Sequence, residues 1–171
     1  MRLEDEASVG YRVRRGEPRD LQALTALALA NRVRHREIGA AKEETIAELG
    51  VRYASYLGGQ ESRHAAIAET LSDGKIVGMA VAVLWEGPRG IIANINDTYV
   101  AAPHRRRGLC RRLVATLAEV FAAHEVDEVT LQWWIDNPGA AAAWKSLGFV
   151  PETIQARVGL GRLRGDGERG G

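Results

Sequence analysis

The residues best suited to hold an anion are concentrated between positions 100 and 113. Five arginines fall within residues 105–112, and Gly108 stands directly before an amphipathic run. Backbone amides at a helix start lack internal acceptors, the helix dipole adds partial positive charge, and glycine lets a phosphate approach the main chain closely. The segment therefore predicts a pyrophosphate-binding turn. An isolated arginine-glycine turn is more often a solvated surface turn, so the prediction depends on the neighbouring motifs.

Cys110 and the histidines offer a second kind of chemistry. Cys110 is the only cysteine, which excludes an internal disulfide and a thiolate zinc cluster. The four histidines show no metal-ligand spacing, so no metal is expected. A cysteine at a helix start can become a nucleophile. Because the sequence places no base beside it, we expect Cys110 to be inert.

The elements around this segment follow from hydrophobic periodicity and turn residues. Asp73-Gly74 supplies the positive φ of a tight hairpin, and Gly108 marks a change from strand to helix period. Leu109, Leu113 and Leu117 share one helical face. Strands are predicted over 11–14, 67–71, 76–85, 91–100, 129–135 and 153–160, and helices from Glu17 to Gly39, from Glu43 to Leu57, from Gly108 onward and over 138–147.

The resulting order, β-α-α-β-β-β-α-β-α-β, describes a mixed, mostly antiparallel sheet flanked by helices, in the α/β or α+β class. With 171 residues, 46% hydrophobic and 26% charged, the chain suits a single domain over 1–163, followed by a disordered tail over 164–171. The start carries acids and no signal-like apolar run, and no stretch approaches the roughly 20 apolar residues of a membrane span. We expect a cytoplasmic protein without a membrane partner.

The motifs together resemble those of the GNAT superfamily of N-acetyltransferases. The acetyl-CoA loop of that family is commonly Arg/Gln-x-x-Gly-x-Gly/Ala after a strand ending in valine, and residues 105–110 match it, with Cys110 in the final small position. Residues 17–21 resemble the family's first-helix start, and 74–78 its hairpin. Residues 137–149, with Asn137, Trp144 and Gly148-Phe149, are similar to its closing signature. The resemblance spans residues 11–160.

The resemblance implies where acetyl-CoA binds. The strand ending at Val100 would splay from the strand around Val129, with pantetheine in the gap, and the amides of residues 106–110 would hold the pyrophosphate. Asn137 would orient the pantetheine arm. The residues that the resemblance assigns to acetyl-CoA are Tyr99, Val100, Arg105, Arg106, Arg107, Gly108, Leu109, Cys110, Arg111 and Asn137.

Catalysis of acetyl transfer needs a base for the attacking amine. Glu69, Glu86 and Asp97 are candidates; Asp97 is preferred because its strand should flank the acetyl group, and Glu86 is second. Many family members protonate the leaving thiolate with a tyrosine where this chain has Trp144. An indole N–H cannot do so, and a core-filling role is expected for Trp144.

Three functions are compatible with these residues. The first is an N-acetyltransferase acting on a primary amine of a small molecule or peptide, and the second is a non-catalytic acyl-CoA-binding or regulatory domain, which the loss of the tyrosine favours. The third, nucleic-acid binding through the arginines, is not expected, because the net charge is only +1 and no base-reading motif is present. The acceptor stays open, and a homodimer through exposed strands is possible.

Overall fold

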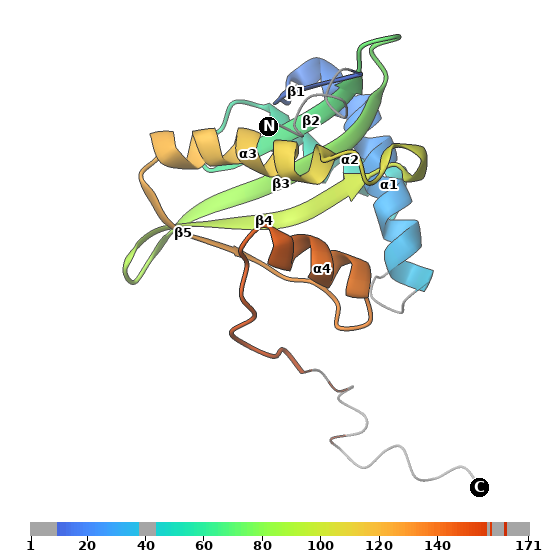
Figure 1. Ribbon diagram of the computed structural model, residues 1–171. Helices are drawn as coiled ribbons and strands as arrows, with labels where there is room; N and C mark the ends of the chain where they lie inside the picture. Colours follow the sequence, from blue (N-terminus) through green and yellow to red (C-terminus); the bar gives the residue numbers. More distant parts are fainter. Residues whose placement is uncertain (1–9, 38–43, 157, 159–162, 164–171) are drawn as a thin grey trace, which may run out of the picture.

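A five-stranded sheet forms the framework of the protein (Figure 1). The computed structural model describes residues 10–37, 44–156, 158 and 163. The sheet contains β1 (Tyr11–Arg15), β2 (Arg63–Thr70), β3 (Ile76–Gly87), β4 (Gly90–Val100) and β5 (Val126–Leu131). The helices are α1 (Leu21–Glu37), α2 (Ile46–Leu57), α3 (Leu109–Ala123) and α4 (Pro138–Ser146), with short 3-10 turns η1 (Pro18–Asp20) and η2 (Ala102–His104).

The strands lie in sequence order, β1-β2-β3-β4-β5. The first four are antiparallel, whereas β5 runs parallel to β4 after the α3 crossover. Parallel neighbours need such a crossover, since a short turn can only reverse the chain. The predicted fold class, a mixed and mostly antiparallel sheet flanked by helices, is confirmed.

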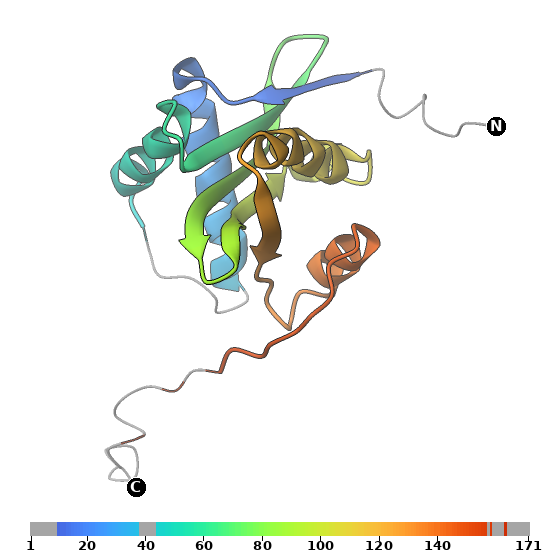
Figure 2. The same ribbon diagram turned by 90° about the vertical axis from the view of Figure 1, so that its left-hand side faces the viewer.

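Helices cover both faces of the sheet (Figure 2). On one face α3 buries Leu109, Leu113 and Leu117, which recur every four residues and so lie on one side of the helix. On the other face α1 and α2 contribute a second core that includes Leu24 and Tyr53. The alternating side chains of β2 and β3 supply both cores, which is why these strands are almost wholly buried.

One extra residue in β4 changes which face its side chains meet. Val81 of β3 pairs with Asp97 while the next residue, Ala82, pairs with Ile95, so Asn96 is left over in a β-bulge. A one-residue shift exchanges the two faces of a strand. Ile95 accordingly packs in the α3 core, whereas Tyr99 packs against the α1–α2 core. The bulge turns Asp97 toward α1 and α2.

Several element boundaries differ from the predicted ones. β5 ends at Leu131 rather than at residue 135, and α2 begins at Ile46, where Thr45 and Glu48 form a reciprocal capping box. The first helix is divided into η1 and α1, and its predicted end at Gly39 and the predicted start of the second helix at Glu43 lie outside the described residues.

The predicted last strand over 153–160 is wrong for the part of it that the structure describes. Residues 153–156 and 158 belong to no strand and are exposed. A strand exists only when its backbone pairs with another, and no described strand lies beside them. Residues 157, 159 and 160, and the predicted tail over 164–171, lie outside the described part of the chain.

Candidate active site

The arginine-rich turn holds its backbone in an unusual conformation. Arg106 has φ 58° and Gly108 has φ 72°, both in the left-handed region. A non-glycine residue there is strained, and such strain is found mostly at functional sites. The turn is fixed from behind by Ala101, whose N–H donates to the Val77 carbonyl at 2.8 Å, and by Arg105, whose Nε donates to the Val100 carbonyl at 2.9 Å.

The start of α3 has amides free to bind an anion. Gly108 is the N-cap residue of α3 and has no side chain that could accept a hydrogen bond, so it leaves the first amides of the helix uncapped. The first helical bond to Gly108 comes from Arg112, whose N–H donates to the Gly108 carbonyl at 3.1 Å. A Cβ atom on Gly108 would meet no atom within 4 Å, so the space beside this residue is open. A phosphate group fits this arrangement.

A cleft of about 330 Å³ opens over this turn. It lies between the end of β4, the start of α3 and the last turn of α4. Seven of the residues predicted to bind acetyl-CoA line it, together with four others, His104, Ala143, Ser146 and Leu147. The seven are Val100, Arg105, Arg106, Gly108, Leu109, Cys110 and Arg111.

The pairing of β4 with β5 ends before β4 reaches Val100, which lines this cleft. The two strands pair from Ile91 opposite Val126 to Ile95 opposite Leu131, and beyond that β4 pairs only with β3. The second half of β4 therefore presents main-chain groups that no described strand pairs. The Oγ1 atom of Thr98, in this half, is buried and has no hydrogen-bond partner among the described residues. Buried polar atoms are nearly always paired, so an orphan beside an unpaired strand edge favours a ligand there.

Asp97 lies at the start of the same unpaired stretch, with its side chain only 9% exposed. Its Oδ2 accepts from the Tyr53 hydroxyl at 2.7 Å, and its Oδ1 accepts from the Asn31 amide at 3.1 Å. Arg32 Nη2 lies 3.4 Å from Oδ2. The structure thus joins β4 to both α1 and α2 through one carboxylate.

A model of the "Acetyltransferase (GNAT) family" matches residues 32–149, which is most of the chain. The chain belongs to the GNAT acetyltransferase family. Similar solved structures include a variant of the BH1408 protein of Bacillus halodurans, with TM-score 0.76, 20% identity and coverage of 87% of this chain and 99% of that one. No curated protein matches the sequence.

Two further GNAT structures share the fold. Glucosamine-6-phosphate N-acetyltransferase from Arabidopsis thaliana has TM-score 0.67 at 16% identity, covering 88% of this chain and 98% of that one. Aminoglycoside N-acetyltransferase AAC(6')-Iy, solved in complex with CoA, has TM-score 0.72 at 16% identity, with coverages of 86% and 94%. At these identities the likeness shows the fold alone.

Three other residues predicted to bind acetyl-CoA do not line the cleft of this GNAT domain. Tyr99 packs against the α1–α2 core, and its ring lies 5.6 Å from the Arg105 guanidinium carbon. Arg107 points toward the Tyr11 ring, 6.0 Å away. Asn137 caps α4, since its Oδ1 accepts from the Ala140 N–H at 3.1 Å. Their part in acetyl-CoA binding stays a prediction.

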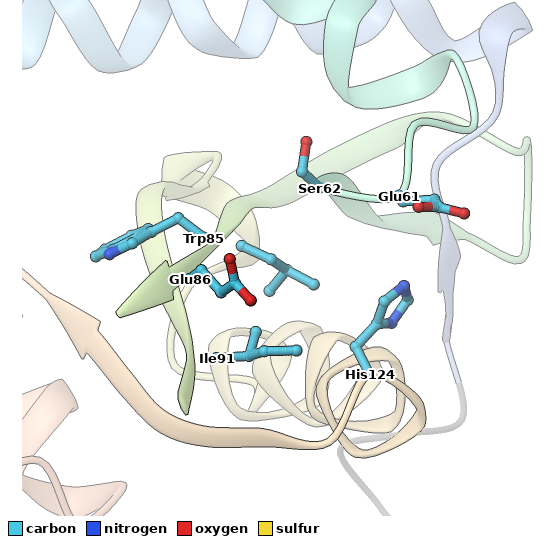
Figure 3. Close-up of a pocket in the computed structure, with 7 residues that line it drawn as sticks. Glu61, Ser62, Trp85, Glu86, Ile91 and His124 are labelled. Atoms are coloured by element: carbon cyan, nitrogen blue, oxygen red, sulfur yellow. The ribbon is translucent and has the colours of Figure 1, made fainter. Parts of the chain in front are cut away.

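The remaining candidate carboxylates lie elsewhere in the GNAT fold. Glu86 lies near the tip of the β3–β4 hairpin. It is five positions along β3 from Val81, which pairs with Asp97, and this separates the two residues by about 17 Å along the strand. There it lines a second hollow of about 310 Å³, across from His124 (Figure 3). Glu69 is nearly buried and forms ion pairs with Arg12 and Arg14. Asp97 is therefore the one of the three beside the unpaired β4 edge.

Cys110 and Trp144 are packed as structural residues. Burial raises the pKa of the Cys110 thiol, which keeps it protonated and weakly nucleophilic. The Trp144 side chain, 8% exposed, lies in the α3 core, with its ring 5.5 Å from that of Phe149 and nearly perpendicular to it.

Sequence reasoning missed the partners of Asp97. Tyr53 and Asn31 are polar residues on otherwise apolar helix faces, and nothing in their spacing connects them to β4. His35, one helical turn after Asn31, is half-buried, and burial lowers its pKa although the Asp97 carboxylate opposes the shift.

Within the described ranges, no three His, Cys, Asp or Glu side chains are grouped so that they could hold a metal ion. Nor is any helix there long and apolar enough to span a bilayer.

Proposed function

We propose that this GNAT domain transfers an acetyl group from acetyl-CoA to a primary amine of a small molecule or peptide. The observation that carries the proposal is the cleft at the start of α3, where open amides, a left-handed turn and arginine side chains meet the unpaired edge of β4. Acetyl-CoA supplies an activated thioester and carries phosphates at its other end, so it needs an anion site joined to a narrow strand-lined gap.

The residues present fit that co-substrate. The amides of Leu109, Cys110 and Arg111 would bind the pyrophosphate, with Arg106 adding positive charge from the exposed side of the turn. The main chain of β4 beyond Asn96 would pair with the amides of the pantetheine arm. Thr98 Oγ1 is the buried hydroxyl available to bind in the same gap.

In the reaction, a bond forms between the amine nitrogen and the acetyl carbon, and the carbon–sulfur bond breaks. Asp97, three residues before Val100 on β4, would take the proton that the amine nitrogen loses, either directly or through a water. Its hydrogen bonds from Tyr53 and Asn31 hold the carboxylate in place. Trp144 is buried and its indole is a donor too weak in acidity to serve as a general acid, so the departing thiolate takes its proton from solvent.

The second candidate function is binding of acyl-CoA without turnover. The observation that favours it is Trp144, because an indole in the core replaces the hydroxyl that many family members use. The two candidates share the cleft and differ only in whether an amine is acetylated.

Calorimetric titration with acetyl-CoA and with free CoA tests the cleft. Binding is expected for the wild type and loss of binding for a Gly108→Glu variant, whose carboxylate would face the same amides. Failure of the wild type to bind either compound would refute both candidates.

An amine panel then separates the candidates. Acetylation in proportion to enzyme concentration supports transfer, and Asp97→Asn should lower kcat at least about a hundredfold while acetyl-CoA binding is retained. Unaltered turnover in Asp97→Asn would remove Asp97 as the base, and binding without any turnover over the panel would leave the acyl-CoA-binding function.

A further inference from the structure

The second hollow, at the end of α3 away from the proposed acetyl-CoA cleft, has a volume of about 310 Å³ (Figure 3). Its walls come from the loop before β2, from both strands of the β3–β4 hairpin and from the C-cap of α3; they include Glu61, Ser62, Leu84, Glu86, Ile91 and His124. We call it the hairpin hollow. Its volume lies at the lower end of the range for small-molecule sites.

Two hydrogen bonds fix the rim of the hairpin hollow. The Leu84 N–H donates to the Ser62 carbonyl at 2.7 Å, which ties the loop before β2 to β3. His64 Nε2 donates to the Glu61 carbonyl at 2.9 Å, and His64 itself is only 6% exposed. A site whose walls are already in place loses little conformational entropy when a ligand binds. The hairpin hollow is therefore pre-formed.

The hydrogen bond of the His124 ring leaves one acceptor nitrogen free. Nδ1 lies 2.9 Å from the Val120 carbonyl, and a carbonyl oxygen only accepts, so in the neutral ring the proton is on Nδ1. The lone pair is then on Nε2, and no residue in the described part of the chain donates to it. The His64 ring lies beside this imidazole, with the two centroids 5.1 Å apart. Burial lowers the pKa of His64, so its ring adds no positive charge there near neutral pH.

The charges at the hairpin hollow are negative. Glu61 and Glu86 both line it, and neither carboxylate forms an ion pair with another described residue. The arginines nearest to them in sequence are engaged elsewhere, because Arg63 contacts side chains of α2 and Arg89 lies 3.7 Å from the Glu128 carboxylate. The C-terminal end of α3 adds partial negative charge from its dipole. These charges and the free imidazole nitrogen favour a cation that donates hydrogen bonds.

We propose that the hairpin hollow binds a small primary ammonium ion with an apolar body, held between Glu86 and His124. These two side chains lie across the hollow from one another (Figure 3). The ammonium group would donate to the Glu86 carboxylate and to His124 Nε2, while Leu84 and Ile91 would contact the apolar body. Glu86 is about 17 Å along β3 from the residue that pairs with Asp97, so this site is separate from the proposed acetyl transfer and does not depend on it.

Glu86→Gln is the variant that tests the site, because it removes the charge and keeps the shape of the side chain. An exposed charge pair contributes little free energy, so the affinity for the ammonium ion should fall about threefold, and about tenfold when Glu61→Gln is added. Glu119→Gln is the matched control, since it removes the same charge from an exposed position of α3 that does not line the hollow. All three side chains are exposed, so the fold should be retained.

The measurement is an NMR titration of backbone amide shifts with 2-phenylethylammonium chloride, at constant ionic strength and without acetyl-CoA. Saturable shifts at Glu86 and His124 are expected for the wild type and, with the same affinity, for Glu119→Gln. The uncharged analogue 2-phenylethanol should bind more weakly than the ammonium ion.

Four results would overturn the proposal. Absence of saturable shifts at Glu86 and His124 would mean that the hollow binds no ammonium ion, and shifts confined to the neighbours of Asp97 would place the ligand in the amine acceptor site. Equal affinity for 2-phenylethanol would remove charge recognition. Equal weakening by Glu119→Gln and Glu86→Gln would show general attraction to the negative charge of the protein rather than a site.

Discussion

Replacing Tyr53 with phenylalanine isolates the hydrogen bond that holds Asp97. Tyr53 is fully buried, and phenylalanine keeps the ring and its packing while removing the hydroxyl that donates to Asp97 Oδ2 at 2.7 Å. Burial, together with the Asp97 charge, raises the pKa of Tyr53, so the phenol stays protonated and donates throughout the working pH range. A hydrogen bond to a charged group contributes roughly 1.5–3 kcal/mol. The free energy of unfolding should therefore fall by about 2 kcal/mol.

Urea unfolding of four proteins measures this bond: wild type, Tyr53→Phe, Asp97→Asn and the double variant. The coupling energy between the two sites should be at least about 1 kcal/mol. Tyr56→Phe is the control on the same helix, because its ring is also buried while its hydroxyl makes no hydrogen bond within the described part of the chain. This replacement should cost under about 0.5 kcal/mol. Equal losses in Tyr53→Phe and Tyr56→Phe, or a coupling energy near zero, would refute the reasoning.

Three further predictions concern the turn, the β4 edge and pH. Gly108→Ala should lower the free energy of unfolding by roughly 1 kcal/mol, because φ 72° suits glycine although the space is open, and calorimetry should show weaker acetyl-CoA binding; unchanged stability would contradict the left-handed turn. Thr98→Val removes the unpaired Oγ1 atom, so thermal stability should stay the same or rise, whereas the affinity for acetyl-CoA should fall. A clear drop in thermal stability would mean that the hydroxyl already has a hydrogen-bond partner in the protein. Burial lowers the pKa of His64, so the unfolded chain takes up a proton before the folded one and stability falls as pH drops below about 6.5, by up to about 1.4 kcal/mol per pH unit. Urea unfolding from pH 7.5 to 5 should show a shallower slope in His64→Gln, and identical slopes would remove His64 as the cause.

The left-handed turn before α3 could be predicted because its determinants are local; phosphate binding there stays a prediction. The helix start, the glycine and the arginines are neighbours in sequence, and the amides they expose depend on α3 alone. The structure accordingly brings Gly108, Leu109 and Cys110 into one cleft with Val100. The hairpin over Asp73-Gly74 is local in the same sense, since the turn residues set its φ.

The surroundings of Asp97 could not be predicted, because they depend on a bulge and on long-range packing. A strict alternation along β4 would have put Asp97 on the same face as Ile95, against α3. The extra residue at Asn96 reverses this, and only then do Tyr53 and Asn31 come within hydrogen-bond distance. The sequence of β4 contains no proline or glycine at that point to mark the irregularity.

The predicted last strand differs in another way, because here the sequence predicts an element that the structure does not show. Residues 150–158 have the alternation of a strand, but pairing is a property of two segments, and the sequence of one segment says nothing of its partner. Asn137 is a milder case, because the same Asn-Pro pair that belongs to the family signature is also a helix cap, and the structure shows the cap.

The bulge at Asn96 also makes the length of β4 part of the protein's chemistry. Every residue from Asp97 to Val100 owes its orientation to one supernumerary position rather than to its own type. Deleting that single residue would leave the composition of the strand almost unchanged, yet the side chains that follow it would face the opposite side of the sheet. The Asp97 carboxylate would then lie in the apolar layer beneath α3 and would lose its contact with Tyr53. In this strand the number of residues therefore matters as much as their types. An insertion or deletion there would alter the environment of every later side chain, whereas a substitution alters one.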